Sequence, residues 1–205
     1  MPTDRANATQ VFDSFADSNL VTILKDGGVG VLPTDTIYGL VCSAGNQNAV
    51  ERLFRVKART NQPGTILAAS VEQLATLGIK LRYLKAVEQY WPNPLSIIIP
   101  CGPELEYLHM GKESLAVRIP ADETIRTLLA STGPLMTTSA NHPGAQVASD
   151  MAEAQSYFGK NVDFYVNGGT LGNRPPSTII RIVDDAIEIL RQGAVQIDEH
   201  GRILS

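Results

Sequence analysis

Cysteine and histidine are scarce in this chain of 205 residues. The two cysteines, Cys42 and Cys101, lie far apart and match no metal-binding or redox spacing. With three histidines and no H-E-x-x-H motif, the sequence does not indicate a zinc hydrolase, and it predicts no metal-ligating residues. Such sparing use of cysteine is typical of a reducing compartment, so we expect a cytoplasmic protein.

Long apolar runs are also absent. No stretch of about 18 uninterrupted apolar residues occurs, so we expect no membrane span. The first residues, Met1–Arg5, lack a basic segment followed by an apolar one, so a signal peptide is not indicated. Hydrophobic residues make up 43% of the chain, enough for a full core, and residues 1–205 are expected to form a single domain.

Positive charge is not in excess. The formal net charge is −4, whereas a protein that coats a duplex phosphate backbone usually carries a surplus of Lys and Arg. Broad binding to nucleic acid is therefore disfavoured. A small anion in a local basic pocket stays open, because net charge says little about one cleft.

Several common site motifs are missing as well. The sequence has no G-x-x-x-x-G-K-[ST] loop and no G-x-G-x-x-G motif, and Gly168–Gly172 fits neither spacing. It also lacks the G-x-S-x-G elbow of serine hydrolases. Any nucleotide site must therefore be built in another way.

The most informative stretch that is present is Leu32–Leu40 (LPTDTIYGL). It follows Gly27-Gly28 and a short apolar run that reads as a buried strand. The strand ends at a proline and continues as Thr-Asp-Thr, which delivers hydroxyls and a carboxylate to its end. Loops at strand ends commonly hold the ligand sites of α/β sheets, although a plain polar turn would give the same pattern.

Cations are concentrated at the end of the next element. Residues 46–59 have the apolar spacing of a helix, and four of the chain's 17 Lys and Arg residues fall within positions 52–59. Lys57 and Arg59 come last. Cations suit the C-terminus of a helix and are often simply solvated, but this density also makes an anion site plausible.

The rest of the chain alternates between the two periodicities. The patterns predict helices over 11–25, with a break near 17–19, and over 71–77, 81–90, 122–130 and 150–158, and a loop over 101–112. They predict strands over 29–32, 65–70, 95–99, 115–119, 135–138, 164–166, 177–183 and 187–191. Because several strands follow one another directly, the fold is expected to be α/β with a mixed parallel and antiparallel sheet.

Two further strand ends carry polar groups. Arg118 interrupts an apolar strand, so it either points to solvent or faces a carboxylate at the working end of the sheet. Ser139-Ala140-Asn141 follows another strand and has the side chains of a turn, which also suit an anion nest. Trp91 is expected to be a packing anchor. His142 is expected to be a turn residue, because nothing nearby in the sequence orients it as a base.

Taken together, these segments resemble the YrdC-like family, the threonylcarbamoyl-AMP synthases. The matching segments occur in the family's order over roughly residues 20–195; they are Pro33–Leu40, Lys57–Arg59, Trp91–Leu95, Val117–Pro120, Ser139–Asn141, Pro176–Ile179 and Leu190–Ala194. Any one of them is weak, but seven in order are a strong signal. The resemblance implies a twisted α/β sheet with helices around an open concave face.

The resemblance also implies an activity and a site. Family members make threonylcarbamoyl-AMP and pyrophosphate from L-threonine, bicarbonate or CO₂, and ATP, with Mg²⁺ expected to accompany the ATP. The product serves the N6-threonylcarbamoyladenosine modification of tRNA beside the anticodon, with tRNA met directly or through downstream transferase proteins. By resemblance, Lys57 and Arg59 are the catalytic cations, and the nucleotide is held by Lys57, Arg59, Ser139, Ala140, Asn141 and Arg191. Threonine is held by Thr36, Tyr38, Arg118, Ser177 and Thr178.

The chain departs from the family pattern after Lys57–Arg59. Many members have Pro, then His or Lys, then Pro-Leu, whereas this chain has Thr60–Thr65 (TNQPGT), which puts a contact with threonine or bicarbonate there in question. The chain ends at Ser205, so we expect the short, single-domain form. The alternative functions are an RNA-binding YrdC-like or YciO-like protein without synthase activity and, more remotely, carbamoyl transfer of the hydrogenase-maturation type.

Overall fold

A computed structural model describes residues 8–58, 62–184, 186–198 and 200–204. Within these ranges, most strands belong to one large mixed sheet: β1 (Gln10–Phe12), β2 (Gly30–Pro33), β3 (Tyr38–Ser43), β4 (Thr65–Leu67), β5 (Leu95–Pro100), β6 (Ser114–Arg118), β7 (Leu135–Ser139), β8 (Phe164–Val166), β9 (Thr178–Val183) and β10 (Ala186–Arg191). Their spatial order is β1-β8-β2-β3-β7-β4-β6-β5-β9-β10. A small separate sheet pairs β11 (Gln196–Ile197) with β12 (Ile203–Leu204).

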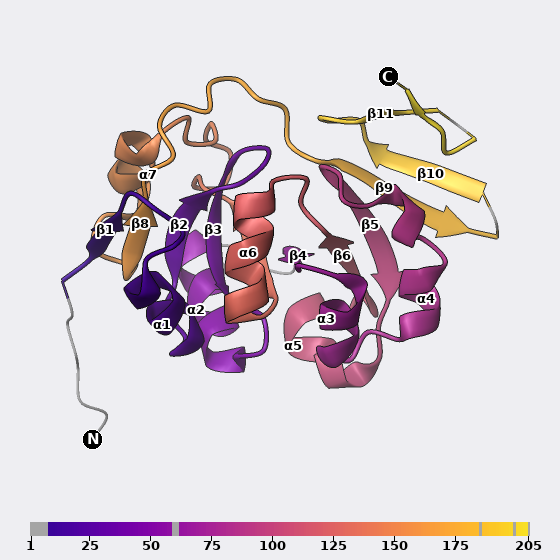
Figure 1. The fold of residues 1–205 in the computed structure, drawn as a ribbon, viewed down its shortest axis with the longest axis horizontal. Helices are drawn as coiled ribbons and strands as arrows, with labels where there is room; N and C mark the ends of the chain where they lie inside the picture. Colours follow the sequence, from indigo (N-terminus) through magenta and orange to yellow (C-terminus); the bar gives the residue numbers. More distant parts are fainter. Residues whose placement is uncertain (1–7, 59–61, 185, 199, 205) are drawn as a thin grey trace.

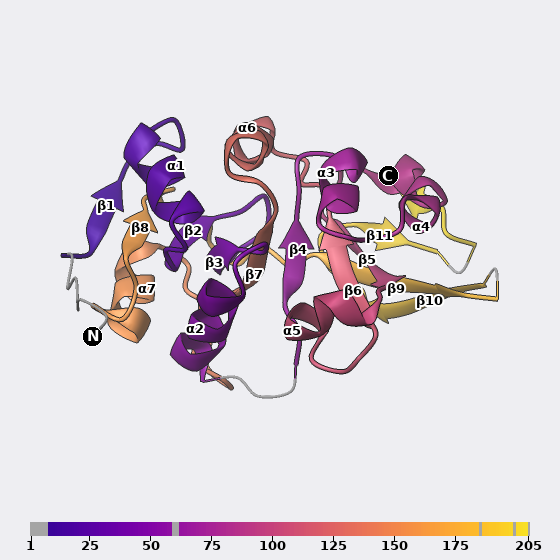
Figure 2. The same cartoon turned by 90° about the horizontal axis from the view of Figure 1, so that it is seen from below.

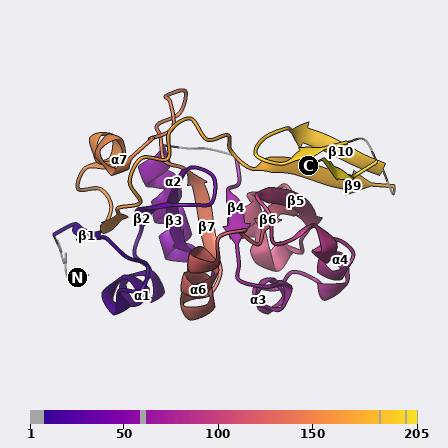
Figure 3. The same ribbon diagram turned by 45° about the horizontal axis from the view of Figure 1, so that its top comes forward.

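Both pairing types occur, as the sequence predicted. β1 with β8, β8 with β2, β4 with β6 and β5 with β9 are parallel, and the other neighbouring pairs are antiparallel. Figure 1 shows the segment between β8 and β9 arching over the top of the sheet, and Figure 3 shows it from a second direction. This crossing leads into β9, which contains Thr178. β9 pairs with β5, and β5 pairs with β6, the strand that contains Arg118.

Helices cover the sheet on both sides. They are α1 (Ser18–Lys25), α2 (Gln47–Lys57), α3 (Val71–Thr76), α4 (Leu81–Lys85), α5 (Glu106–His109), α6 (Glu123–Thr132) and α7 (Met151–Phe158), with the 3₁₀ turns η1 (Glu88–Tyr90) and η2 (Pro103–Leu105). In Figure 2, α1, α6 and α3 lie along one side of the strands and α2, α7 and α5 along the other. None of the described helices is long and apolar enough to cross a membrane.

Side-chain caps fix where many of these helices begin. Asp122 accepts from the backbone N–H groups of Thr124 and Ile125 at 2.7 and 3.1 Å, and Ser70 accepts from that of Gln73 at 3.3 Å. Asp17, Asn46 and Asp150 cap α1, α2 and α7 in the same way. Each cap satisfies backbone donors that the first turn leaves unpaired, which is why these residue types mark the starts correctly in the sequence.

Three of the predicted elements are wrong in part. In residues 11–25 the helix begins at the expected break, after its cap at Asp17, but Val11 and Phe12 before it pair with β8 and are not helical. Residues 101–112 contain η2 and α5 and are not simply a loop. The helix predicted over 81–90 divides into α4 and η1. In each case tertiary packing overrides a weak local pattern.

Strand β3 was not predicted at all. It lies between β2 and β7 and is buried along almost its whole length, with Leu40, Val41 and Cys42 fully covered. A strand buried on both faces shows no alternation of apolar and polar residues, so the period-two signal is missing. Its place in the sheet turns Thr34–Ile37 into the tip of a β2–β3 hairpin.

One half-buried carboxylate joins segments that are far apart in the chain. Asp163, just before β8, accepts from the backbone N–H of Val29 at 2.8 Å and from Arg52 on α2 at 2.9 Å. We expect Asp163→Ala to lower the free energy of unfolding by about 2 kcal/mol, because the Val29 donor and the Arg52 guanidinium lose their acceptor together. Urea denaturation measures this change. Glu72→Ala, which removes the exposed Glu72–Lys85 ion pair (3.5 Å), is the control and should cost no more than about 0.5 kcal/mol; equal losses in the two variants would contradict the prediction.

Candidate functional site

Six of the residues that the sequence singles out converge on one cavity of about 480 Å³. Its walls come from the β2–β3 hairpin, the segment 63–65, strands β5, β6, β7, β9 and β10, and the end of the 167–177 crossing. Thr36, Tyr38, Arg118, Ser139, Ser177 and Arg191 all line it. The size suits a small ligand rather than a macromolecule.

The charged side chains on the described wall of this cavity are all cationic. Among the described residues that line it, the charged side chains are Lys112, Arg118, Arg181 and Arg191, and there is no carboxylate. The remaining polar lining consists largely of hydroxyls, from Thr34, Thr36, Thr65, Thr137, Thr138, Ser114, Ser139 and Ser177. Cations and hydroxyls without a competing carboxylate favour an anionic ligand.

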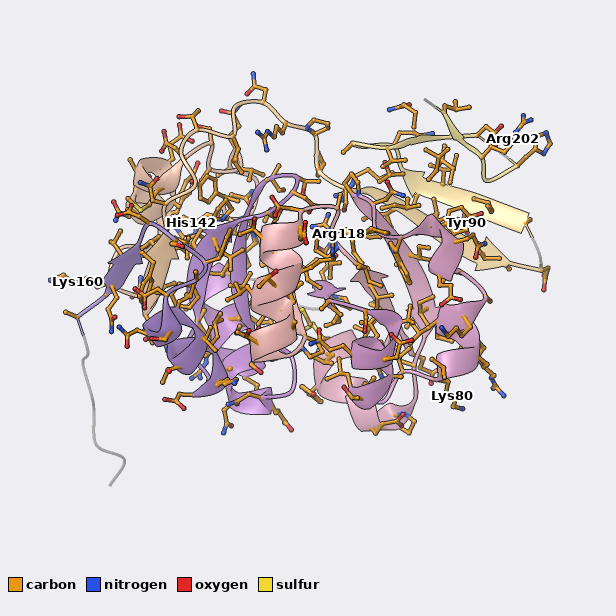
Figure 4. All side chains as sticks on the ribbon, viewed as in Figure 1. Lys80, Tyr90, Arg118, His142, Lys160 and Arg202 are labelled. Atoms are coloured by element: carbon orange, nitrogen blue, oxygen red, sulfur yellow. The ribbon has the colours of Figure 1, made fainter. Side chains whose placement is uncertain are left out.

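Arg118 lies at the centre of this arrangement (Figure 4). Its side chain is 4% exposed and forms an ion pair with Asp35, itself 5% exposed, at 3.2 Å between Nη2 and Oδ1. Nη1 also donates to the hydroxyl of Thr36 at 3.4 Å. Of the two readings that the sequence left open, solvent or a facing carboxylate, the structure selects the second.

The ion pair leaves hydrogen-bonding capacity unused. Within the described part of the chain, Arg118 Nε and Asp35 Oδ1 are buried without a hydrogen-bond partner, although Oδ1 lies 3.2 Å from Nη2 of the arginine. Burial lowers the pKa of the Arg118 guanidinium from its ordinary value, and Asp35 opposes that shift. A buried N–H without an acceptor costs stability, so this arginine is held in place at some energetic cost.

The hairpin tip that holds Asp35 is internally hydrogen-bonded. The Thr34 hydroxyl donates to the carbonyl of Ile37 at 2.7 Å and accepts from the backbone N–H of Thr36 at 3.2 Å. The other carboxylate oxygen of Asp35 accepts from the backbone N–H of Ala121 at 3.0 Å. The tip is therefore fixed to the segment after β6, and Thr36 is held against Arg118.

Tyr38 fixes the chain crossing to the hairpin. Its hydroxyl donates to the carbonyl of Gly169 at 2.8 Å and accepts from the backbone N–H of Gly168 at 2.9 Å. Burial raises the pKa of this phenol, so it stays protonated near neutrality. A side chain at position 168 would clash with Pro33, since a Cβ there would lie 2.4 Å from the proline ring, and glycine permits this close approach.

Lys57 stands behind the cavity wall. It is 3% exposed, and its Nζ donates to the carbonyls of Ser139 and Asn141 and to the side-chain oxygen of Asn141, each at 2.6 Å. The Ser139 hydroxyl donates to the same Asn141 oxygen at 2.7 Å. The lysine therefore fixes the shape of the Ser139–Asn141 segment.

That segment does not form the open nest of N–H groups that the sequence suggested. The N–H of Ala140 donates to the carbonyl of Tyr38 at 2.9 Å, and that of Asn141 donates to the carbonyl of Ser139 at 3.0 Å. Of these three residues, Ser139 lines the cavity, while Ala140 and Asn141 lie behind it.

Arg191 and Thr178 have different positions. Arg191 lines the cavity, and its Nε and Nη2 donate to the carbonyl of Ser177 at 3.0 and 2.8 Å. Thr178 is fully buried and is not on the wall; its hydroxyl bonds to the backbone of Val195 and accepts from the N–H of Gly193 at 2.9 Å. Thr178 thus anchors the turn that follows Arg191. Arg59, which the sequence also nominated, lies outside the described residues.

The segment where the chain departs from the family pattern reaches the cavity. Pro63 and Gly64 line it. A Cβ at Gly64 would lie 2.5 Å from the backbone carbonyl oxygen of Thr137, so the backbone approaches β7 more closely than any other residue would allow. The unusual sequence therefore forms part of the site.

Trp91 and His142, which the sequence did not assign to the site, lie outside the cavity wall as expected. Trp91 is 9% exposed, packs in the core and donates through its indole N–H to the carbonyl of Leu95 at 2.8 Å. His142 packs against the rings of Tyr157 and Phe158, with Nε2 2.9 Å from the carbonyl oxygen of Tyr157, and does not line the cavity.

Sequence reasoning missed Lys112 and Arg181 as lining residues. A signal was present for one of them. Arg181 lies on β9 two residues after Ile179, which also lines the cavity, so the alternation of a β-strand places both on the same face; Lys112 lies in the turn before β6, where no periodicity could have placed it.

No group of three or more His, Cys, Asp or Glu side chains within the described ranges is arranged to hold a metal ion. A divalent cation at this site would depend on ligands from the substrate. Mg²⁺ is commonly bound in this way, by phosphate oxygens and water.

Comparison with known proteins places the chain among relatives. The family described as Telomere recombination (Sua5/YciO/YrdC) matches residues 22–193. The chain is 38% identical over 163 residues to a protein of Marinobacter nauticus named threonylcarbamoyl-AMP synthase, covering 77% of this chain and 86% of the relative.

Solved structures of members of this family have a similar fold. Sua5 of P. abyssi, complexed with L-threonine, superposes with a TM-score of 0.77 at 28% identity and covers 86% of this chain; this chain spans 54% of that longer protein. YciO of E. coli gives a TM-score of 0.75 at 27% identity, covering 90% of this chain and 96% of its own. The same mixed α/β fold is found in these neighbours, so the predicted fold class is confirmed. By the extent of these matches, the chain belongs to the Sua5/YciO/YrdC family.

Proposed function

We propose that this protein is an L-threonylcarbamoyladenylate synthase, which forms threonylcarbamoyl-AMP and pyrophosphate from L-threonine, bicarbonate or CO₂, and ATP. The observation that carries the proposal is the cavity itself, where cations and hydroxyls from distant segments meet without a carboxylate on the described wall. Relatives named threonylcarbamoyl-AMP synthase at 33–38% identity support it, as does the L-threonine complex of Sua5. The product would serve the threonylcarbamoyl modification of tRNA, directly or through downstream transferases.

The chemistry makes clear demands on such a cavity. The threonine amine adds to CO₂ and loses a proton to solvent to give a carbamate anion, and a carbamate oxygen then attacks the α-phosphorus of ATP. The new O–P bond forms as the bond to the β-phosphate oxygen breaks, and pyrophosphate leaves with the electron pair. An anionic nucleophile approaching a polyanion needs cations aimed at both partners, so electrostatics and positioning carry the catalysis.

The residues divide these tasks between them. Arg118, which lines the cavity, is the partner for the threonine carboxylate, and Thr36 and Ser177 lie on the same wall. Ser139 and Arg191 contact the nucleotide phosphates. The family resemblance assigns Arg59, which lies outside the described residues, to the same task. Lys57 acts by holding Ser139–Asn141 in shape. Mg²⁺ arriving with ATP would neutralise phosphate charge.

The decisive assay measures pyrophosphate release from ATP. We expect release only when L-threonine and bicarbonate are both present, because the attacking oxygen belongs to the carbamate that the two substrates form. Mass spectrometry should detect threonylcarbamoyl-AMP in the same reaction. Pyrophosphate release that did not require both L-threonine and bicarbonate would contradict the proposal. A salt-dependent affinity for RNA that exceeded the affinity for ATP would favour the RNA-binding alternative.

Arg118→Lys tests the carboxylate contact. The substitution keeps the charge beside Asp35 but removes the planar fork, so the KM for L-threonine should rise about 30-fold while the KM for ATP changes by less than about threefold. Steady-state kinetics measures both. Arg126→Lys is the control, because Arg126 donates to the carbonyls of Pro120 and Ala121 close by but does not line the cavity. Equal increases for both substrates would contradict the assignment.

Lys57→Met tests the support of the Ser139–Asn141 segment. The thioether fills similar space but leaves two inward-facing carbonyls without their donor, so we expect about 2 kcal/mol less stability and at least a tenfold higher KM for ATP. Denaturation and kinetics give the two numbers. Lys25→Met, on the exposed end of α1, should change neither. If Lys57→Met turned over at the wild-type rate with an unchanged KM for ATP, the supporting role assigned to Lys57 would be wrong.

A further inference from the structure

Ser96 on β5 carries a buried hydroxyl to which the proposed function gives no task. Its side chain is fully covered and does not line the cavity. Its Oγ lies 3.0 Å from the Oγ of Ser177, which does line the cavity. Strand register brings the two together, because Ser96 is opposite Ile179 on β9 and Ser177 directly precedes that strand. Within the described part of the chain, Ser177 is the one hydrogen-bond partner of the Ser96 hydroxyl.

The direction of this hydrogen bond follows from burial. A serine hydroxyl has one proton to donate and two lone pairs that accept. If Ser177 donated to Ser96, the Ser96 proton would be buried without an acceptor among the described residues, which costs stability. If Ser96 donates to Ser177 instead, that cost disappears. Ser96 is therefore the donor, and the Ser177 hydroxyl oxygen is the acceptor.

Arg191 supplies a second donor to the same oxygen. Its Nη2 donates to Ser177 Oγ at 3.3 Å, and its Nε and Nη2 also donate to the Ser177 carbonyl at 3.0 and 2.8 Å. Both lone pairs of the Ser177 hydroxyl are then occupied, and its own proton has no acceptor within the described residues. A ligand in the cavity therefore meets Ser177 as a hydrogen-bond donor only.

We propose that Ser96 is a positioning residue, which acts with Arg191 to turn the Ser177 hydroxyl proton toward an oxyanion of the substrate. The identity of this oxyanion rests on the proposed function, which makes it the carboxylate of L-threonine. A carboxylate only accepts hydrogen bonds, whereas the ammonium group of an amino acid only donates them. The orientation of Ser177 therefore favours the carboxylate end of L-threonine and leaves the amine elsewhere in the cavity, where it can form the carbamate.

Calorimetric titration with L-threonine and with ATP tests this role without turnover. We expect Ser177→Ala to weaken L-threonine binding about tenfold and Ser96→Ala about fivefold, with ATP affinities within about twofold of wild type. Because Ser96 acts only through Ser177, Ser96→Ala/Ser177→Ala should match Ser177→Ala within about twofold. A further loss of about fivefold in the double variant, or an equal loss of ATP affinity, overturns the proposal.

Thr132→Val is the matched control for the loss of a buried hydroxyl. Thr132 is 9% exposed, its hydroxyl donates to the carbonyl of Leu128 at 3.1 Å, and it does not line the cavity. We expect this variant to bind L-threonine as the wild type does, even where its stability falls. A loss of L-threonine affinity equal to that of Ser96→Ala would show that any weakened core has this effect, and would overturn the positioning role.

Urea denaturation tests the direction of the bond between Ser96 and Ser177 without any substrate. Ser177→Ala leaves the buried Ser96 proton without an acceptor, whereas Ser96→Ala/Ser177→Ala removes both hydroxyls together. We therefore expect the double variant to unfold at a higher urea concentration than Ser177→Ala. A lower midpoint for the double variant overturns the assigned direction.

Steady-state kinetics separates this proposal from the proposed function. Ser96→Ala should raise the KM for L-threonine about fivefold and leave kcat within about twofold, since a carboxylate contact is the same in the ground state and the transition state. An equal fall in kcat with an unchanged KM overturns the positioning role. If the variants bind L-threonine as expected but the wild-type protein releases no pyrophosphate from ATP, the proposed synthase activity fails while the role of Ser96 stands.

Discussion

The site depends on one buried ion pair, between Arg118 on β6 and Asp35 at the tip of the β2–β3 hairpin. Taking both charges out of water is costly, and their mutual attraction offsets that cost only because each also contacts neighbouring groups. Asp35 accepts from Ala121, and Arg118 donates to Thr36. The pair therefore ties the hairpin tip to the end of β6, and it does so with a guanidinium that still has an unused N–H.

The positive character of the cavity follows from how β-strands present their side chains. An acidic chain can hold a basic pocket if its carboxylates stay off the relevant faces, and here Asp35 and Glu188 each contact a cavity arginine without joining the described cavity wall. These carboxylates hold the guanidinium groups in place and reduce their net charge. The arrangement favours ligands that carry more than one negative charge, because a weakly charged ligand gains little from cations that are already partly paired.

Much of the fold could be predicted because local signals agreed with the tertiary structure. Asp122 and Ser70 cap helices where the sequence placed them, and most strands follow clear apolar patterns. β3 was missed because burial on both faces removes the alternation, and Val11 and Phe12 were misassigned because a three-residue strand exists only through its pairing with β8. The site motifs came from family resemblance, which names residues but does not say which of them face the cavity.

The difference between a motif residue and a cavity-lining residue matters for Lys57 and Thr178. Neither lines the cavity, and their side chains form hydrogen bonds with the segments that present Ser139 and Arg191. A motif lysine is readily taken for a phosphate ligand because its charge is visible in the sequence and its burial is not. Here three hydrogen bonds of 2.6 Å from its Nζ hold the Ser139–Asn141 segment. The groups left to meet a ligand directly are those that line the cavity, such as Arg118. The chain thus uses buried, fully bonded residues to keep the cavity-lining ones in position, and this gives the cavity its shape before any ligand arrives.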